Sequence, residues 1–289
     1  KAAIEKGLDP NKFGQKLSFF FNSHNGFLEE ISKFRAARRI WSKIMKKRFG
    51  VTNKKALMCR FHTQTGGSTL SSNEIDNNII RTTLQSLAAV FGGTQSLHTN
   101  SKDEALALPT NSSARLALRT QQIIASETNI PKYPDPFGGS YIIEELTNDI
   151  EKKTFKLINK IDELGGSISA IEKNFIQEQI SQSAYDYQKN IDEKKIKIVG
   201  VNVLNKKIKD TDPTTLFIDE KQVDNQIKSL EIFKKRRNNI QVQLKLNELK
   251  KISKSSDNLM PSIISCIKND CTLGEISNIL RKVFGEYIP

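Results

Sequence analysis

The sequence has few of the residues that build disulfides, metal sites or base-stacking surfaces. Its 289 residues include three cysteines, three histidines and one tryptophan. Cys59, Cys266 and Cys271 are odd in number and lack a CxxC spacing, so they predict neither a disulfide framework nor a zinc site. No apolar run approaches the roughly 18 residues that span a membrane, and no signal peptide precedes the first helix-like segment. We therefore expect a reducing, cytoplasmic location and no bound metal.

Phosphate-binding glycine loops are also missing, whereas positive charge is abundant. The glycine pairs match neither GxGxxG nor GxxxxGK[ST], which excludes those two kinds of nucleotide loop. The net charge is +13, and it comes from lysines scattered among asparagines and isoleucines without aromatic residues that could stack bases. This pattern favours a solvated lysine-rich surface over a nucleic-acid site. A small ligand that carries phosphates fits the charge equally well.

The first half of the chain alternates strand-like runs with helical patterns. Apolar residues recur at helical spacing from Phe27 to Met45 and again from Ile80 to Phe91. This rhythm predicts a parallel sheet with helices outside it. Beyond about residue 150 the pattern becomes mainly helical, with two helices at the end and flexible loops expected at 205–215 and 251–260. The strand-like runs are 16–22, 56–65, 93–100 and 138–146.

Polar side chains gather where the second and third strand-like runs end, in "HTQTGGS" (62–68) and "SLHTN" (96–100). In folds with parallel strands, this edge of the sheet forms the ligand face. Ser101 and Glu104 also match a capping box, in which the serine caps a helix and the glutamate bonds back to it. The cap and a ligand role for Glu104 are competing interpretations.

Three further polar residues have an ordinary structural interpretation. His62 and His98 lie in strand-like runs without a carboxylate or cysteine at metal-ligand spacing, so we interpret them as hydrogen-bonded structural residues. Arg38 falls on the apolar stripe of its helix, and there we expect an ion pair or a side chain that reaches out to solvent. Contact with a ligand phosphate is the alternative for Arg38.

Three stretches of sequence together resemble the large, catalytic subunit of the cobalamin-dependent methylmalonyl-CoA mutase family. They are "RFHTQTGGSTL", "NNIIRTTLQSLAAVFGGTQSLHTNSKDEALALPTNSSARLALRTQQII" and "DPFGGSYIIEELT". The resemblance covers residues 13–147 closely and continues more loosely to 271–287. It implies an α/β fold, the C-terminal part of a (β/α)8 TIM-type barrel over 1–156, and a helical extension that packs on the barrel over 157–289.

The resemblance also implies a reaction and its cofactor. In this family the adenosyl radical of adenosylcobalamin takes a hydrogen atom from the acyl-CoA that threads the barrel. The thioester group then migrates, which interconverts (R)-methylmalonyl-CoA and succinyl-CoA. The protein supplies position and shielding from water. We therefore expect an isomerase of propionate metabolism.

Nine residues match family positions that bind ligands. Asn100 and Glu104 correspond to contacts with the adenosyl ribose, which shifts our interpretation of Glu104 from cap to ligand. Lys16 is a departure from the arginine usual in the family, so we expect weaker CoA binding, because lysine lacks a planar pair of donors. The remaining positions line the corrin or the CoA path. The cofactor set is Gln64, Gly67, Asn100, Glu104 and Ala107, and the acyl-CoA set is Lys16, Ser18, Lys55 and Ser96.

Two family features have no counterpart in the sequence. The strands that carry the catalytic residues should precede Lys1, so we assign no catalytic residue here and expect a partial chain with doubtful activity alone. The D-x-H-x-x-G signature of the cobalt-ligating domain is missing, which implies a separate small cobalamin-binding subunit and a hetero-oligomer. The alternatives are a sister mutase for isobutyryl-, 2-hydroxyisobutyryl- or ethylmalonyl-CoA, a non-catalytic half-barrel partner protein, and a basic nucleic-acid module.

Overall fold

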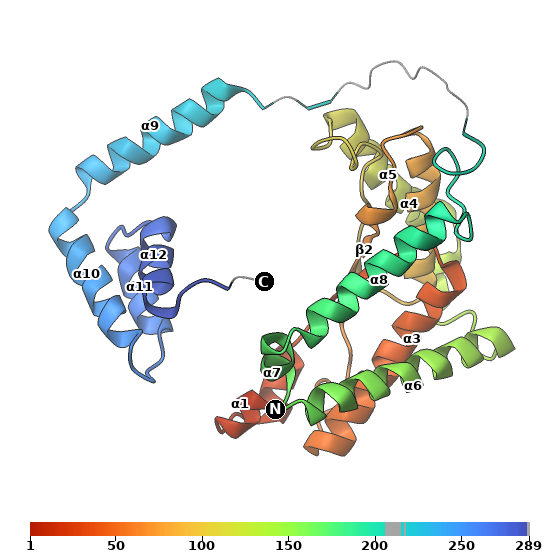
Figure 1. The fold of residues 1–289 in the computed structure, drawn as a ribbon, viewed down its shortest axis with the longest axis horizontal. Coiled ribbons are helices and arrows are strands. Elements are labelled where there is room, and N and C mark those ends of the chain that lie inside the picture. Colours follow the sequence, from red (N-terminus) through yellow and green to blue (C-terminus); the bar gives the residue numbers. More distant parts are fainter. Residues whose placement is uncertain (206–214, 217, 288–289) are drawn as a thin grey trace. The chain divides into compact units, whose positions relative to one another are not determined.

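The computed structural model describes residues 1–205, 215–216 and 218–287, and the chain forms two compact units (Figure 1). The first unit is Lys1–Leu216 and the second is Phe217–Pro289. The loop expected at 205–215 lies almost wholly outside the described residues. The boundary expected at residue 156 falls inside a helix, so the extent of the barrel portion stays a prediction.

A three-stranded parallel sheet organises the first unit. Its strands are β1 (Phe19–Ser23), β2 (Phe61–Thr65) and β3 (Ser96–His98), in the spatial order β1-β2-β3. The sequence prediction of a parallel sheet with helices outside is therefore confirmed for the first three strand-like runs. Each observed strand is shorter than its run, because the run also contains the turn or the short helix that precedes the strand.

The prediction of a fourth strand at 138–146 is wrong. Helix α6 (Tyr141–Glu163) occupies most of this stretch. Ile143, Thr147 and Glu151 recur at a spacing of four, and all three are buried against helix α3 (Phe27–Lys43). A short run such as "YIIEEL" fits a strand or a helix by itself, and packing on α3 decides for the helix.

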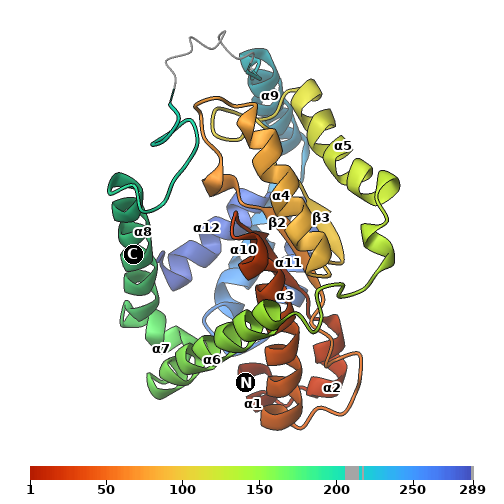
Figure 2. The same cartoon turned by 90° about the vertical axis from the view of Figure 1, so that its right-hand side faces the viewer.

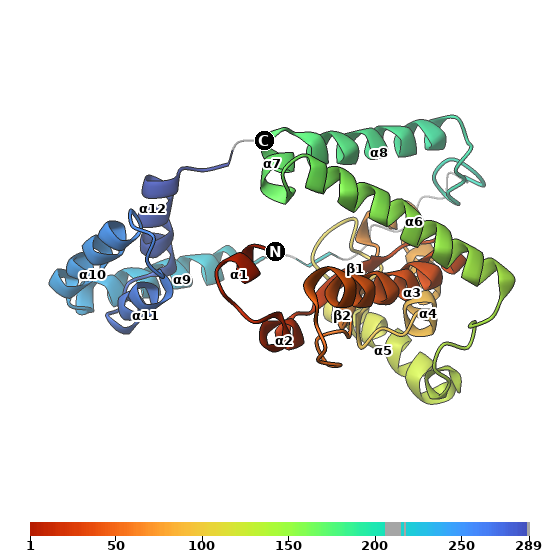
Figure 3. The ribbon, with the colours of Figure 1, turned by 90° about the horizontal axis from the view of Figure 1, so that it is seen from below.

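Helices α3 and α4 (Asn77–Phe91) cover one face of the sheet (Figures 2 and 3). Phe34 of α3 stacks on Phe61 of β2 with 5.2 Å between ring centroids, and Ala89 of α4 joins the same cluster. Arg38 donates a 2.5 Å hydrogen bond to the carbonyl oxygen of Gly92, so neither solvent exposure nor an ion pair describes this half-buried guanidinium. The helical patterns predicted from Phe27 and from Ile80 are confirmed.

The remaining elements of the first unit are short helices around the sheet and a longer C-terminal group. Gly165 and Gly166, both at positive φ, end α6, as the glycine pair in the sequence predicts. The bounds are α1 (Ala2–Glu5), α2 (Pro10–Phe13), η1 (Gly14–Lys16), η2 (Ile44–Arg48), η3 (Gly67–Thr69), α5 (Asn111–Glu127), η4 (Ile130–Lys132), α7 (Ser167–Glu172) and α8 (Phe175–Asp192).

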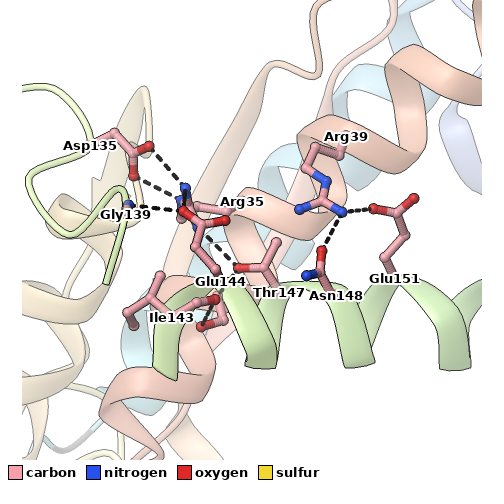
Figure 4. A network of polar contacts seen from close by, with 10 residues as sticks. Arg35, Arg39, Asp135, Gly139, Ile143, Glu144, Thr147, Asn148 and Glu151 are labelled. Carbon is pink, nitrogen blue, oxygen red and sulfur yellow. Dashed lines mark hydrogen bonds and ion pairs between the residues drawn. The ribbon is translucent and has the colours of Figure 1, made fainter. Parts of the chain in front are cut away.

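A ladder of ion pairs fastens α6 to α3 (Figure 4). Arg35 bonds Glu144 at 2.7 Å and Asp135 at 2.9 Å. One to two turns further along, Arg39 and Lys43 both bond the buried carboxylate of Glu151. Burial opposes ionisation of Glu151, but the hydrogen bonds from Lys43 and Arg39 outweigh it and hold its pKa below the ordinary value.

The described residues of the second unit form four helices and a core of their own. The elbow between α9 and α10 is fixed by Arg237, whose guanidinium bonds both oxygens of Glu275 at 2.5 and 2.8 Å. These bonds lower the pKa of Glu275 to about 2. Thr272 and Glu275 form a capping box at the start of the last helix. The helices are α9 (Glu220–Arg236), α10 (Asn239–Ile252), α11 (Met260–Lys268) and α12 (Leu273–Phe284), and the core residues are Val242, Leu246, Leu249, Cys266, Cys271 and Ile276.

Candidate functional site

The face of the sheet opposite α3 and α4 carries side chains that point away from the core. Side chains alternate along a strand, so every second residue faces this side. The other face holds residues such as Phe61 and Thr63, which are buried. We call the uncovered side the open face, and it presents Phe20, Asn22, His62, Gln64, Ser96 and His98.

The strand register orders the open face into two layers. In the lower layer Phe20, His62 and Ser96 are cross-strand neighbours. The His62 ring lies 5.0 Å from the Phe20 ring, and its Nδ1 is 2.7 Å from Ser96 Oγ. His62 is thus hydrogen-bonded, as predicted. Because Nδ1 is engaged by Ser96, the other ring nitrogen is left for a ligand on the open face.

The upper layer lies two residues nearer the C-terminal ends of the strands. It consists of Asn22, Gln64 and His98 in register. Gln64 Nε2 donates a 2.8 Å hydrogen bond to Asn100 Oδ1, which fixes the orientation of the Gln64 amide. Asn100 is itself anchored, because its backbone N–H bonds Thr65 Oγ1 at 2.9 Å and its Nδ2 bonds the Thr65 carbonyl oxygen at 3.1 Å.

At the C-terminal edge of β2 and β3, three predicted cofactor residues come together. A Cβ atom on Gly67 would lie 2.9 Å from Asn100 Nδ2 and 3.3 Å from Glu104 Oε1. Asn100 is 2% exposed, whereas Glu104 is exposed. The edge therefore presents one free carboxylate next to a tightly packed glycine.

A buried glutamine of α4 holds the loop that contains Gly67. Gln85 Oε1 accepts a 2.9 Å hydrogen bond from the Gly66 backbone N–H, and its Nε2 donates to Asn25 and Thr69. Its backbone carbonyl accepts from Ser23 Oγ at 2.8 Å. One side chain thus links the ends of β1 and β2 to α4. The sequence did not indicate this role of Gln85, because the residues that it bonds are far away in the chain.

The capping-box interpretation of Ser101 and Glu104, which the family resemblance had already displaced, is contradicted by the structure. Residues 101–110 form turns, and α5 begins ten residues later with Thr110 as its cap. Ser101 Oγ instead donates to the buried carboxylate of Asp103, which also accepts from Ser113 at 2.5 Å. Burial alone would raise the pKa of Asp103. The hydrogen bonds that its carboxylate accepts have the larger effect, so the pKa lies below its ordinary value. The Ser101 hydroxyl is thus bonded to Asp103, and Glu104 is exposed.

The other predicted residues lie in three places. Lys16 ends η1, while Ser18 and Lys55 precede β1 and β2, and all three are exposed at the N-terminal edge of the sheet. Ser96 lies on the open face. Ala107 is half-buried in the turn segment before α5, with its N–H bonded to the Asp103 carbonyl oxygen at 3.1 Å.

A groove of about 810 Å³ runs along the C-terminal ends of β1 and β2. His24, Ser68 and Thr69 line it beside the sheet, and the rest of its lining comes from α6 and from Phe175 to Gln188 of α8, with both apolar and polar side chains. This volume is within the range of small-molecule sites. The predicted cofactor residues are not among the residues that line this groove, although Ser68 directly follows Gly67.

The comparison with known proteins decides the family. The sequence model of the family described as "Methylmalonyl-CoA mutase" matches residues 1–286. The chain belongs to the methylmalonyl-CoA mutase family. Members of this family are mutases, a class of isomerase, and in general depend on cobalamin.

Relatives within the family differ in the substrate that their names state. The chain is 43% identical over 289 residues to mitochondrial methylmalonyl-CoA mutase of Bos taurus, covering 99% of the chain and 38% of that protein. It is 40% identical over 282 residues to the 2-hydroxyisobutanoyl-CoA mutase large subunit of Aquincola tertiaricarbonis, covering 97% of the chain and 50% of that protein. Methylmalonyl-CoA mutase of Rhizobium meliloti (strain 1021) is 38% identical over 294 residues, with 99% and 40% covered.

These comparisons set the scale of the chain within the mutase family. The chain spans half or less of the length of these relatives. Its similar identity to two kinds of mutase leaves the acyl substrate to be argued from the site.

The sequence analysis did not single out Asn22, and its interpretation of His98 as a hydrogen-bonded residue is wrong, because the His98 side chain makes no hydrogen bond to any residue that the structure describes. The signal was the period-two alternation that places them on the same side as Gln64 once strand register is known. The described part of the chain also lacks two kinds of feature. It contains no cluster of three or more His, Cys, Asp or Glu residues suited to a metal, and no helix long and apolar enough to cross a membrane.

Proposed function

We propose that the chain is part of an adenosylcobalamin-dependent mutase that interconverts (R)-methylmalonyl-CoA and succinyl-CoA. The observation that carries this proposal is that the two edges of the open face carry different kinds of residue. Lys16, Ser18 and Lys55 lie at the N-terminal edge, and Asn100 and Glu104 lie at the C-terminal edge. In the complete protein the sheet would form part of a (β/α)8 barrel, with the open face inside.

An acyl-CoA fits a face with two different edges, because its phosphates and its acyl thioester are at opposite ends of the molecule. The lysines at the N-terminal edge would attract the phosphates, and the extended arm would run along the open face. Ser18 and Asn22 are four residues apart, which corresponds to about 13 Å at roughly 3.3 Å per residue. The thioester would then reach the polar layers with His62 held by Ser96 and Gln64 held by Asn100.

The groups at the C-terminal edge fit the sugar of an adenosyl group. A carboxylate accepts hydrogen bonds from vicinal hydroxyls, and Glu104 is exposed for this purpose. Asn100 is nearly buried and already bonded to Gln64 and Thr65, so its contribution in this structure is to position Gln64. A direct contact of Asn100 with the ribose stays a prediction, as do the corrin contacts of Gly67 and Ala107.

The chemistry that adenosylcobalamin supplies when bound is radical hydrogen abstraction from the acyl group. The residues described here would orient the ester and exclude water from it. The fixed amide of Gln64 and the fixed ring of His62 hold their donors without reorganisation when the ester arrives. A small cobalamin-binding subunit remains the proposed partner, consistent with the large-subunit name of the Aquincola relative. A cytoplasmic location stays a prediction, since the bovine relative is named as mitochondrial.

Two substitutions test the two ends of this arrangement in the intact protein with adenosylcobalamin. Glu104→Ala should lower kcat by about 10- to 100-fold, because a hydrogen bond to a charged group contributes roughly 1.5–3 kcal/mol. Binding of the CoA ester, measured by calorimetry, should change less than about twofold. Lys55→Ala should instead weaken ester binding several-fold with a smaller effect on kcat. Glu127→Ala, at the exposed end of α5, is the control.

Unchanged turnover of Glu104→Ala would remove Glu104 from the cofactor site. Loss of ester binding in Glu104→Ala, equal to that in Lys55→Ala, would contradict the direction proposed for the ester. The second candidate function is 2-hydroxyisobutanoyl-CoA isomerisation, because the chain is also 40% identical to the Aquincola mutase large subunit. Comparing kcat/KM for the two esters decides between them.

A further inference from the structure

The upper layer of the open face differs from the lower layer in how its outer members are bonded. In the lower layer His62 is engaged by Ser96. In the upper layer Gln64 is held by Asn100, but the side chains of Asn22 and His98 make no hydrogen bond to any residue that the structure describes. Both are exposed on the open face. Two polar side chains thus flank a fixed amide without a hydrogen-bond partner of their own among the described residues.

The position of this layer follows from the proposed function, on which the inference rests. Ser96, on the CoA path, belongs to the layer below, and Asn100 and Glu104 lie at the edge above. The reacting carbon must lie between the thioester arm and the adenosyl group, because one end of the acyl group loses hydrogen while the other bears the thioester. The upper layer is the level between them. Asn22 and His98 would therefore face the acyl group.

The chemistry of the layer indicates which acyl groups suit it. An asparagine amide and an imidazole each offer a donor and an acceptor, and Gln64 adds a further amide. Once a barrel closes over the open face and water leaves, an unsubstituted alkyl group would leave these atoms without partners. A site built to hydrogen-bond an oxygen of the substrate discriminates strongly against an analogue that lacks it.

We propose that Asn22 and His98 select acyl-CoA esters whose acyl group carries an oxygen substituent, a hydroxyl or a carboxylate, over plain alkyl esters. The shared feature is an oxygen atom that accepts from the Asn22 or His98 N–H. The two kinds of oxygen substituent, a carboxylate and a hydroxyl, differ in charge. A carboxylate is repelled by a negative charge in the layer, whereas a hydroxyl can donate to it.

The experiment uses the intact protein with every subunit that copurifies with it. Values of kcat/KM, and dissociation constants measured by calorimetry without cofactor, are compared for methylmalonyl-CoA, 2-hydroxyisobutanoyl-CoA and isobutanoyl-CoA. Asn22→Leu should reduce the preference for the oxygen-bearing ester over isobutanoyl-CoA about tenfold, in both measurements. His98→Phe should act in the same direction. Asn225→Leu, the same change on the exposed helix α9, should leave the preference unchanged.

Asn22→Asp identifies the source of the oxygen. It should weaken methylmalonyl-CoA more than 2-hydroxyisobutanoyl-CoA if a carboxylate meets the layer, and the reverse order would identify a hydroxyl. An equal effect of Asn22→Leu and His98→Phe on all three esters, or no effect, would overturn this inference while the mutase function stands. A wild-type protein that binds and converts none of the esters would overturn the proposed function, and the inference with it.

Discussion

Gly67 lies so close to Asn100 and Glu104 that a single added methyl group would have to displace one of them. In Gly67→Ala the new Cβ would be 2.9 Å from Asn100 Nδ2, which is itself bonded to Thr65. We expect a loss of about 1–3 kcal/mol in the free energy of unfolding, since overpacking at a constrained site carries this cost. Urea denaturation of the intact protein measures it.

A matched glycine substitution provides the control for Gly67→Ala. Gly274 lies in the first turn of α12 at negative φ, and an added Cβ there meets no atom within 4 Å. Gly274→Ala should leave stability unchanged or raise it slightly, because alanine restricts the unfolded chain. Equal stability of both variants would mean that Gly67 is not packed as described.

The structure shows where four of the predicted cofactor residues lie, whereas their roles stay predictions. Gln64, Gly67, Asn100 and Glu104 are brought together at one edge of the sheet, as the polar runs after two strands indicate. The cap expected at Ser101 fails because the buried carboxylate of Asp103 takes the serine hydroxyl. That competition involves Ser113, twelve residues away from Ser101, and no local pattern reveals it.

At the scale of elements, the ion-pair ladder between α3 and α6 makes a testable contribution. Glu151 is 7% exposed and bonds both Lys43 and Arg39, and Figure 4 shows its contact with Arg39. Glu151→Gln should reduce the free energy of unfolding at pH 7 by about 1–3 kcal/mol, because two cations lose their charged partner. Glu145→Gln, an exposed position on the same helix, should have almost no effect.

The pH dependence of the same variant gives an independent check. The pKa of Glu151 is lower in the folded protein than its ordinary value, so the folded state binds fewer protons there than the unfolded state. The stabilisation is complete above the unfolded pKa of about 4.5 and is lost as the pH falls below it. Wild type and Glu151→Gln should therefore converge in stability under acidic conditions. A difference that is constant from pH 7 to pH 3 would contradict the ionic origin.

Helix α4 shows how far periodicity predicts an element without predicting its surroundings. The apolar spacing from Ile80 to Phe91 correctly indicates a helix. Ile80 and Leu84, however, are 62% and 51% exposed, while Gln85 on another side is fully buried. The hydrogen bonds of Gln85 to the loop after β2 explain its burial. Helical spacing identifies a stripe, but which stripe faces the sheet depends on partners elsewhere in the chain.

At the scale of the molecule, the division into two compact units predicts how the intact protein unfolds. Each unit has its own buried core. Calorimetry should show two transitions, of which Glu151→Gln lowers one and Glu275→Gln lowers the other. The Arg237 guanidinium holds the pKa of Glu275 at about 2, so the second unit should lose stability as the pH falls from about 4.5 towards 2. One transition that both substitutions shift equally would show that the units unfold as one.

The sequence by itself determined the alternation of strands and helices, the polar runs at the strand ends and the resemblance to the mutase family. These features depend on the types of side chain and on residues a few positions apart, and both can be read directly from the sequence. Tertiary structure alone decided that "YIIEEL" is helical, that Asp103 takes the hydroxyl of Ser101, and that Asn22, Gln64 and His98 form one layer. The physical reason is that burial, register and competition for hydrogen-bond partners are set between segments far apart in the chain, and these contacts outweigh local preference wherever the two disagree.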